Sequence, residues 1–376
     1  MSRVTNIETL RAAKRIVVKI GSALIAQSGE PRQSWLDSLA SDLAKQRAAG
    51  QDIVLVSSGA IALGRDQLGS ERPRKLEEKQ AAAALGQPLL MSAMAQAFRP
   101  SNISVAQALL TLDDTENRRR WLNARATLET LLTAGAIPII NENDSVATDE
   151  IRYGDNDRLA ARVAQMIGAE ALILLSDVDG LYTADPRQDS NAEHIAEIED
   201  LTGEHEAMAG NINQDADLGS GGMVTKLAAA RIAQSAGCST IIARGTPDHP
   251  IEALFSGARS TWITSKLSPD KAREVWLHGH LTPEGSVFID AGAQEALAQG
   301  ASLLPVGITR VEGQFVRGSA VAIKSNAGET IAKGITAYSS EDASRIAGLK
   351  SDQIEQELGY RGRPALVHRN DLVLER

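Results

Sequence analysis

The 376-residue sequence has a single cysteine, Cys238, so no disulfide can form within the chain. This scarcity fits a reducing compartment, and we expect the protein to work in the cytoplasm. Cys238 follows Gly237 and precedes the strand-like run at 239–243. That position indicates a small core residue rather than a nucleophile.

Long apolar runs and a basic surplus are also missing. No apolar run approaches the ~18 residues of a membrane span, and residues 1–15 lack the apolar core of a signal peptide. The net charge is −9, and residues 266–376 hold 13 basic and 14 acidic side chains. The balance argues against a nucleic-acid binder, which needs a basic patch.

Short apolar runs alternate with helical patterns over the first 265 residues, as in an α/β protein with a parallel sheet. The predicted strands are 15–20, 52–56, 103–109, 137–140, 171–175 and 239–243. Helices are predicted at 33–49, 77–98, 118–133 and 227–236, and a further helix follows a loop at 155–157. The helix at 77–98 is expected to be interrupted at 86–88. The length allows two domains.

Small polar residues follow several of these strands. Lys19 lies near the end of the first strand, Ser57-Ser58 follow the second, and Ser176-Asp177 follow the strand at 171–175. Open parallel sheets bind ligands at the carboxyl ends of their strands. A lysine in an apolar strand needs a partner. It is therefore either an ammonium pointed at a phosphate or an edge lysine that reaches water.

Two polar loops and a glycine-rich stretch extend this pattern. Residues 141–144 (NEND) follow a strand, and 155–157 (DND) precede a helix. A capped helix with surface turns is the alternative explanation of the second loop. Glycines at 219–222 precede a helix with Lys226 in its first turns, an arrangement that can surround an anion. The spacing of a Walker A loop is absent.

The character of the chain changes after Ser265. Predicted strands at 286–290, 306–311, 320–324 and 330–337, with a helix at 291–299, indicate a small, mostly-β domain. His278 and His280 alternate as two residues of one strand would. No further cysteine or histidine lies nearby, so we predict no metal site there.

Six motifs, in this order, resemble the amino-acid kinase family and, within it, the kinases that phosphorylate L-glutamate. They are VVKIGSAL (17–24), VSSGAIALG (56–64), NENDSVAT (141–148), GDNDRLAARVA (154–164), GLYTADPR (180–187) and GSGGMVTKL (219–227). The carboxyl part, with GASLLPVGI at 300–308, resembles a PUA domain. The resemblance covers nearly the whole chain. It implies an amino-acid kinase domain over 1–265, then a linker and PUA-like domain over 266–376.

The resemblance implies an αβα sandwich around a mostly parallel sheet. It also implies ATP-dependent, magnesium-assisted phosphorylation of the L-glutamate γ-carboxylate to γ-glutamyl phosphate, the first step of proline biosynthesis. L-Proline is the implied feedback inhibitor, and the following reductase the implied recipient of the labile product. A homo-oligomer is expected, and neither a membrane nor a nucleic acid is expected as a partner.

The matching motifs also imply site residues. The catalytic positions match Lys19, Asp157 and Lys226. The glutamate-binding positions match Ser58, Asp144 and Asn156, with Asn141 beside them. The ATP-binding positions match Lys19, Ser176, Asp177, Ser220, Gly221, Gly222, Met223, Val224, Thr225 and Lys226. No residue is expected to be a dedicated metal ligand.

This residue set suits phosphoryl transfer, which needs positioning and charge neutralisation. Asp157 can hold the ammoniums of Lys19 and Lys226, or meet a magnesium ion through water. An acceptor carboxylate of pKa ~4.3 is ionised at neutral pH and needs no general base. The six histidines all lie outside the motifs, which agrees with a reaction that needs no general base. Asp144 is the natural partner of the substrate α-ammonium, and Asn141, Asn156 and Ser58 can hydrogen-bond its carboxylates.

Three alternatives stay open at this point. Another kinase of the same fold would act on acetylglutamate, aspartate, carbamate or a nucleoside monophosphate. An RNA-binding protein would use the PUA-like domain, although the charge balance of residues 266–376 argues against tight binding. A nicotinamide dehydrogenase is a poor candidate, because no GxGxxG follows the first strand.

Overall fold

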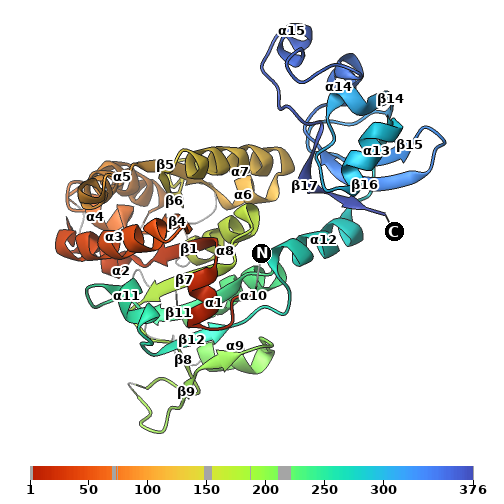
Figure 1. Ribbon diagram of the computed structural model, residues 1–376. Helices are drawn as coiled ribbons and strands as arrows, with labels where there is room; N and C mark the ends of the chain where they lie inside the picture. The colour runs from red at the N-terminus through yellow and green to blue at the C-terminus, as the bar shows by residue number, and fades with distance from the viewer. Residues whose placement is uncertain are drawn as a thin grey trace. The chain divides into compact units, whose positions relative to one another are not determined.

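A computed structural model describes residues 3–69, 73, 75–147, 155–186, 188–210 and 222–375. The chain divides into two compact units, Met1–Lys271 and Ala272–Arg376 (Figure 1). None of the helices in the described ranges combines the length and the apolar character that a membrane crossing requires.

An eight-stranded sheet in the order β10-β12-β11-β7-β1-β4-β6-β5 forms the centre of the first unit. Its strands are β1 (Arg15–Ile20), β4 (Asp52–Ser57), β5 (Val105–Leu110), β6 (Ile137–Glu142), β7 (Ala171–Ser176), β10 (Glu197–Ile198), β11 (Ser239–Arg244) and β12 (Ser260–Ile263). Neighbouring strands run parallel except for the antiparallel pair β11–β12. The predicted mostly parallel sheet is confirmed.

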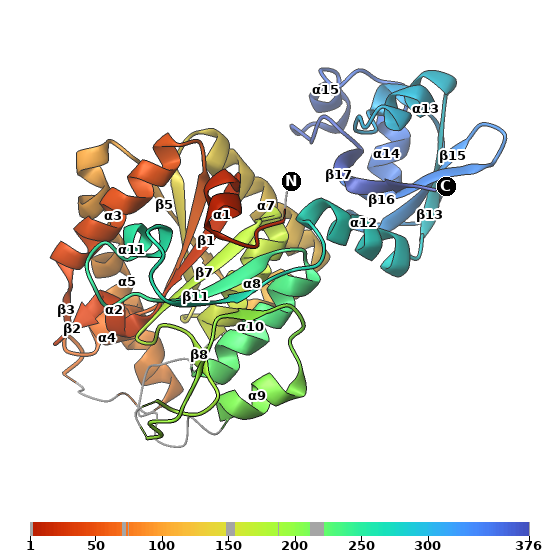
Figure 2. The ribbon, with the colours of Figure 1, turned by 60° about the horizontal axis from the view of Figure 1, so that its bottom comes forward.

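Two layers of helices cover this sheet (Figure 2). The first holds α1 (Ile7–Ala12), α3 (Gln33–Ala48), α5 (Leu76–Phe98) and α11 (Pro250–Phe255), and the second holds α7 (Arg118–Thr133), α8 (Asp155–Ile167), α9 (Gly203–Gly210) and α10 (Met223–Ser235). Short elements complete the unit: α2 (Ser22–Ile25), β2 (Ala26–Gln27), β3 (Glu30–Pro31), α4 (Ala60–Gly64), α6 (Leu112–Glu116), β8 (Leu181–Tyr182) and β9 (His194–Ile195). The predicted αβα sandwich is therefore confirmed.

Side chains of β1 alternate between the two helix layers, as strand geometry requires. Ile16, Val18 and Ile20 pack in the core cluster of the first layer, and Val17 packs in that of the second. Lys19 shares the face of Val17. The alternation therefore directs its ammonium toward the layer that contains α8 and α10.

The predicted interruption of α5 at Gly86-Gln87-Pro88 is wrong, because the helix runs unbroken from Leu76 to Phe98. Gly86 serves a close crossing with α4: a Cβ there would lie 1.8 Å from the Ala60 carbonyl oxygen. On the other helix, a Cβ at Gly64 would lie 1.9 Å from the Ala82 carbonyl oxygen. Tertiary packing here outweighs the low helix propensity of glycine and proline.

Three other expected boundaries also shift. Asp155, Asn156 and Asp157 form the first turn of α8 instead of a preceding loop, a position that favours acidic side chains. β6 continues through Asn141 to Glu142. α10 begins at Met223, with Gly222 as its N-cap. In each case a regular element extends to include polar residues of the motifs.

The second unit contains a five-stranded sheet in the order β14-β13-β15-β16-β17. Its elements are α12 (Pro269–His280), which begins within the first unit, β13 (Gly285–Ile289), α13 (Ala291–Ala298), β14 (Ile308–Gly313), β15 (Ala320–Ser325), β16 (Thr330–Thr336), α14 (Ser340–Ile346), α15 (Ile354–Leu358) and β17 (Val367–Leu374). The predicted mostly-β character is confirmed, whereas β17 was not predicted.

The expectation that His278 and His280 share a strand is wrong, because both belong to α12. Pro269 occupies the first position of this helix and Asp270 its first turn. Both residue types are favoured at a helix start. The linker expected at the start of residues 266–376 therefore contains the helix α12.

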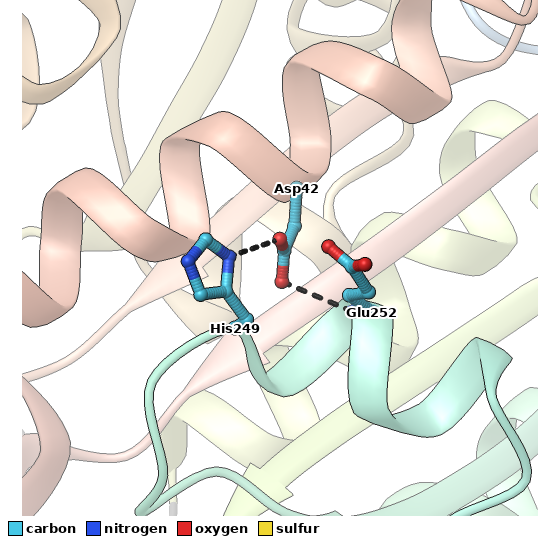
Figure 3. A group of neighbouring side chains, drawn as sticks. All are labelled: Asp42, His249 and Glu252. Atoms are coloured by element: carbon cyan, nitrogen blue, oxygen red, sulfur yellow. Dashed lines mark hydrogen bonds and ion pairs between the residues drawn. The ribbon is translucent and has the colours of Figure 1, made fainter.

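Asp42 joins α3 to α11 (Figure 3). Its buried carboxylate contacts His249 Nδ1 at 2.7 Å and accepts hydrogen bonds from the amides of Ile251 at 3.2 Å and Glu252 at 3.0 Å. The Glu252 carboxylate pairs instead with Lys45 at 2.6 Å. Asp42 thereby satisfies the first amides of α11, which otherwise lack partners. We assign the cluster a structural role.

Candidate active site

The candidate site lies at the edge of the sheet where β1, β4, β6 and β7 end. These strands are parallel, so their carboxyl ends meet at the same edge. β1 lies between β4 and β7. The chain crosses from β1 to β4 on one side and reaches β7 on the other. Open α/β sheets bind ligands in the crevice at such a switch point.

A buried carboxylate between two lysines forms the first part of the site. Lys19 Nζ of β1 lies 2.7 Å from Asp157 Oδ1, and Lys226 Nζ of α10 lies 3.6 Å from Asp157 Oδ2. The Thr225 hydroxyl donates to Asp157 Oδ2 at 2.8 Å. Lys19, Asp157 and Lys226 are 4%, 0% and 5% exposed. β1 has a partner on each side, so the edge-lysine alternative for Lys19 is wrong.

The electrostatics of this cluster favour an anionic ligand. Burial acts to raise the pKa of Asp157, but the two ammoniums and hydrogen bonds from Lys19 and Thr225 outweigh it and hold that pKa below its usual range. Burial lowers the pKa of Lys226, and Lys19 adds to this although Asp157 opposes it. The outcomes differ because the two cations and the hydrogen bonds outweigh burial at Asp157, whereas burial and the like charge of Lys19 outweigh the carboxylates at Lys226. A bound anion would offset the surplus positive charge.

A chain of hydrogen-bonded amides forms the second part. Asn156 Nδ2 donates to Ser58 Oγ at 3.1 Å and to Asn141 Oδ1 at 3.2 Å. Asn141 Nδ2 donates in turn to Gln87 Oε1 at 2.8 Å. Asn156 and Asp157 are consecutive residues of α8, so the amide chain adjoins the lysine cluster. The ends of β4 and β6 and one helix of each layer, α5 and α8, supply these side chains.

Three further predicted residues follow β6 or lie at the end of β7 at the same edge of the sheet. Asp144 is buried in the turn after β6. The Ser176 hydroxyl at the end of β7 donates to Asp177 Oδ1 at 3.0 Å. The Asp177 carboxylate is close enough to Lys226 to act to raise its pKa.

The glycine-rich segment is described only in part. Gly222 caps α10, Met223 is buried and Val224 is exposed. Ser220 and Gly221 lie outside the described residues.

Cys238 was expected to be core filler, and this is confirmed. The side chain is fully buried, and burial raises the pKa of its thiol far above the usual range. A thiol in this environment is inert as a nucleophile.

Gln87 is the residue of the amide chain that the sequence analysis missed. The triplet Gly86-Gln87-Pro88 was interpreted as a helix break. The available signal was a polar residue next to a glycine in an alanine-rich helix, where it has no partner along its own face.

Two protein-family models match the chain: the amino acid kinase family over residues 14–244 and the PUA domain over residues 285–358. Three bacterial relatives are similar over nearly their whole length. The glutamate 5-kinase of Paramagnetospirillum magneticum is 56% identical, over 97% of this chain and 99% of its own. The glutamate 5-kinase of Caulobacter vibrioides is 54% identical, over 96% and 97%. Glutamate 5-kinase 1 of Rhizobium meliloti is 53% identical, over 98% and 93%.

The buried lysine cluster allows a prediction about stability. Asp157→Ala leaves two buried ammoniums without their shared counter-ion, and removal of one partner of a buried pair costs about 3–5 kcal/mol. We expect the free energy of unfolding of the first unit, measured in urea, to fall by about this amount. Adding Lys226→Met should restore part of the loss. A fall below about 1 kcal/mol in Asp157→Ala would contradict this account.

Proposed function

The chain belongs to the amino acid kinase family, where it groups with the glutamate 5-kinases, and we propose that its site transfers the γ-phosphoryl group of ATP to the γ-carboxylate of L-glutamate. The product would be γ-glutamyl phosphate, the first intermediate of proline biosynthesis. One observation carries this proposal: the buried Lys19–Asp157–Lys226 cluster directly adjoins the amide chain at Asn156. Positive charge suits a polyphosphate donor, and neutral hydrogen-bonding groups suit a small amino acid.

The two lysines would stabilise charge that moves during the transfer. Each ammonium has three N–H donors, so it can bind a phosphate oxygen while it contacts Asp157. Asp157 would fix both ammoniums in advance, so that little reorganisation accompanies the reaction. The acceptor carboxylate is ionised at neutral pH, so no side chain has to remove a proton. Positioning and neutralisation are what phosphoryl transfer requires of a protein.

We assign the ATP side of the site to Ser176, Asp177 and residues 220–226, with Lys19 shared between both substrates. The interaction of Asp177 with Lys226 supports this assignment, because it links the end of β7 to the start of α10. Magnesium is proposed as the ion that accompanies ATP and would neutralise part of its charge. The oxygens of Asp157 already contact Lys19, Thr225 and Lys226, so this carboxylate fits a magnesium ion only through water.

The glutamate side is assigned to Ser58, Asn141, Asp144 and Asn156. The hydrogen bonds that join Ser58, Asn141 and Asn156 support it, since they hold three polar groups together at the sheet edge. Asp144 is the candidate partner of the α-ammonium.

We further propose that residues 1–265 form the kinase domain and residues 266–376 a linker and PUA-like domain. The family resemblance also supports a cytoplasmic homo-oligomer that hands its labile product to the following reductase. Light scattering of the purified protein tests the oligomer, and a monomer at assay concentrations would contradict it.

The function is tested by trapping the acyl phosphate with hydroxylamine. We expect hydroxamate to form only with ATP, magnesium and L-glutamate present together. The rival acceptors are acetylglutamate, aspartate, carbamate and nucleoside monophosphates. Faster turnover of any of them would make that compound the proposed substrate in place of L-glutamate. A chain shortened to end near Ser265 should keep the activity. If the shortened chain folds but is inactive at saturating substrates, the proposal that residues 1–265 form the kinase domain is wrong.

The roles of the lysines give a second prediction. Lys19→Ala and Lys226→Ala should each lower kcat about a hundredfold or more, because each removes a donor to charge that develops in the transition state. Lys45→Ala, an exposed lysine of α3, is the matched control and should leave kcat unchanged. A kcat near that of the wild type in either site variant would remove that lysine from the mechanism.

Asp144 should act on one substrate only. Asp144→Ala removes a proposed charged contact with the α-ammonium, which is present before and during the reaction. The KM for glutamate should therefore rise about tenfold or more, while the KM for ATP stays nearly constant. Asp113→Ala, an exposed aspartate of α6, is the control. A selective defect in ATP binding would instead place Asp144 on the nucleotide side.

L-Proline should inhibit by competition with glutamate. It keeps the α-carboxylate and a charged amine, which Asp144 and the amide chain can hold, but it has no γ-carboxylate to accept a phosphoryl group. The measurement is the initial rate against glutamate at several proline concentrations. An unchanged apparent KM with a reduced maximal rate would place proline at a separate site.

A further inference from the structure

One backbone amide determines the polarity of the whole amide chain. Glu142 N–H donates to the oxygen of the Asn141 side chain at 2.9 Å. A backbone N–H can only donate, so this atom of Asn141 must be Oδ1. The side-chain nitrogen of Asn141 then faces Gln87, at 2.8 Å from an atom that must be an acceptor. The Gln87 amide is therefore oriented with Oε1 toward Asn141.

Two polar atoms remain without a partner once these orientations are set. Gln87 Nε2 and Asn156 Oδ1 are both buried and make no hydrogen bond within the part of the chain that the structure describes. Buried polar side-chain atoms rarely lack partners, and such exceptions often mark a functional site. One is a donor and the other an acceptor, and each belongs to a side chain that is hydrogen-bonded to Asn141. Such a pair suits a ligand that carries both a carboxylate and an ammonium.

We infer that Gln87 determines substrate specificity by donating a hydrogen bond from Nε2 to the α-carboxylate of the amino-acid substrate. This inference rests on the proposed function. The buried, unpartnered Nε2 at the end of the amide chain is the observation that supports it. Asn156 Oδ1 would accept a hydrogen bond from the α-ammonium in the same way.

The order of the side chains from Asp157 to Gln87 indicates which carboxylate of a bound glutamate Gln87 would contact. Asp157 belongs to the lysine cluster, where the accepting γ-carboxylate must lie. From there the contacts run through Asn156 and Asn141 to Gln87, which is the last member of the chain. The far end of a bound glutamate, its α-carboxylate, is thus the group that reaches Gln87.

The position of Gln87 depends on the close crossing of α4 and α5. Gly86 precedes it and lies against the backbone of α4, where a Cβ would overlap the Ala60 carbonyl oxygen. Asn141 lies on the face of β6 that is turned toward the first helix layer, since Ile137 and Ile139 pack in that core cluster. The crossing therefore brings Gln87 within hydrogen-bonding distance of Asn141.

The test uses the full chain with Gln87→Glu, which keeps Oε1 for Asn141 and replaces the donor Nε2 by an oxygen. L-Glutamate is compared with L-isoglutamine, in which the α-carboxylate is a carboxamide and the γ-carboxylate is retained. The carboxamide can donate to the new carboxylate, whereas the α-carboxylate of glutamate is repelled. Gln96→Glu, at an exposed position of α5, is the matched control.

We expect Gln87→Glu to raise the KM for glutamate at least about tenfold and to leave the KM for ATP within about twofold. The ratio of kcat/KM for glutamate to that for isoglutamine should fall at least about tenfold relative to Gln96→Glu. A smaller change in this ratio, or an equal rise in both KM values, overturns the inference. If Gln87→Glu does not fold, Gln87→Met is measured. A KM for glutamate within about twofold of the wild type then overturns it.

The two proposals fail in different ways. The proposed function would be refuted if neither the wild-type protein nor Gln96→Glu forms hydroxamate that depends on glutamate. An active control together with an unaffected Gln87→Glu would refute only the role of Gln87.

Discussion

The ion pair of Asp157 with two lysines is the interaction on which the site depends. Two buried ammoniums at one place would repel each other and resist dehydration, and a shared carboxylate makes the arrangement tolerable. β1, α8 and α10 each contribute one of the three residues, so the cluster forms only when the sheet and the second helix layer have assembled. The remaining surplus of positive charge is what a phosphate group would neutralise.

The amide chain complements this cluster because it is neutral and directional. Its members come from α5, β6, α8 and the residue that follows β4. Asn156 and Asp157 are neighbours in the first turn of α8, where the backbone is fixed by helix geometry. A shift of this turn would move the contacts of Asp157 with the lysines and the contacts of Asn156 with the amides together. The two halves of the site are therefore coupled through one rigid element.

Much of this could be predicted from the sequence. The apolar runs that became β1, β4 and β7 were bounded to within a residue, because buried parallel strands read as continuous apolar segments. Lys19, Asp157 and Lys226 were found through motif resemblance, and spacing alone could not have brought them together. The course of α5 through Gly86 and Pro88 was not predictable, because it depends on the α4 backbone against which Gly86 packs. The helix α12 was missed for a simpler reason: Pro269-Asp270 suits a helix start as well as a linker.

Gln87 shows why the remaining part of the site could not be predicted from the sequence. Its role cannot be read from its residue type, since a glutamine in an alanine-rich helix is ordinarily a surface residue. The polarity of its amide follows from Asn141, which in turn follows from the Glu142 N–H, and these residues are distant in the sequence from α5. β6 ends at Glu142, so the donor that orients the chain is the last amide of a strand at the ligand-binding edge. The backbone of the sheet thus directs side-chain polarity on a helix that packs against it.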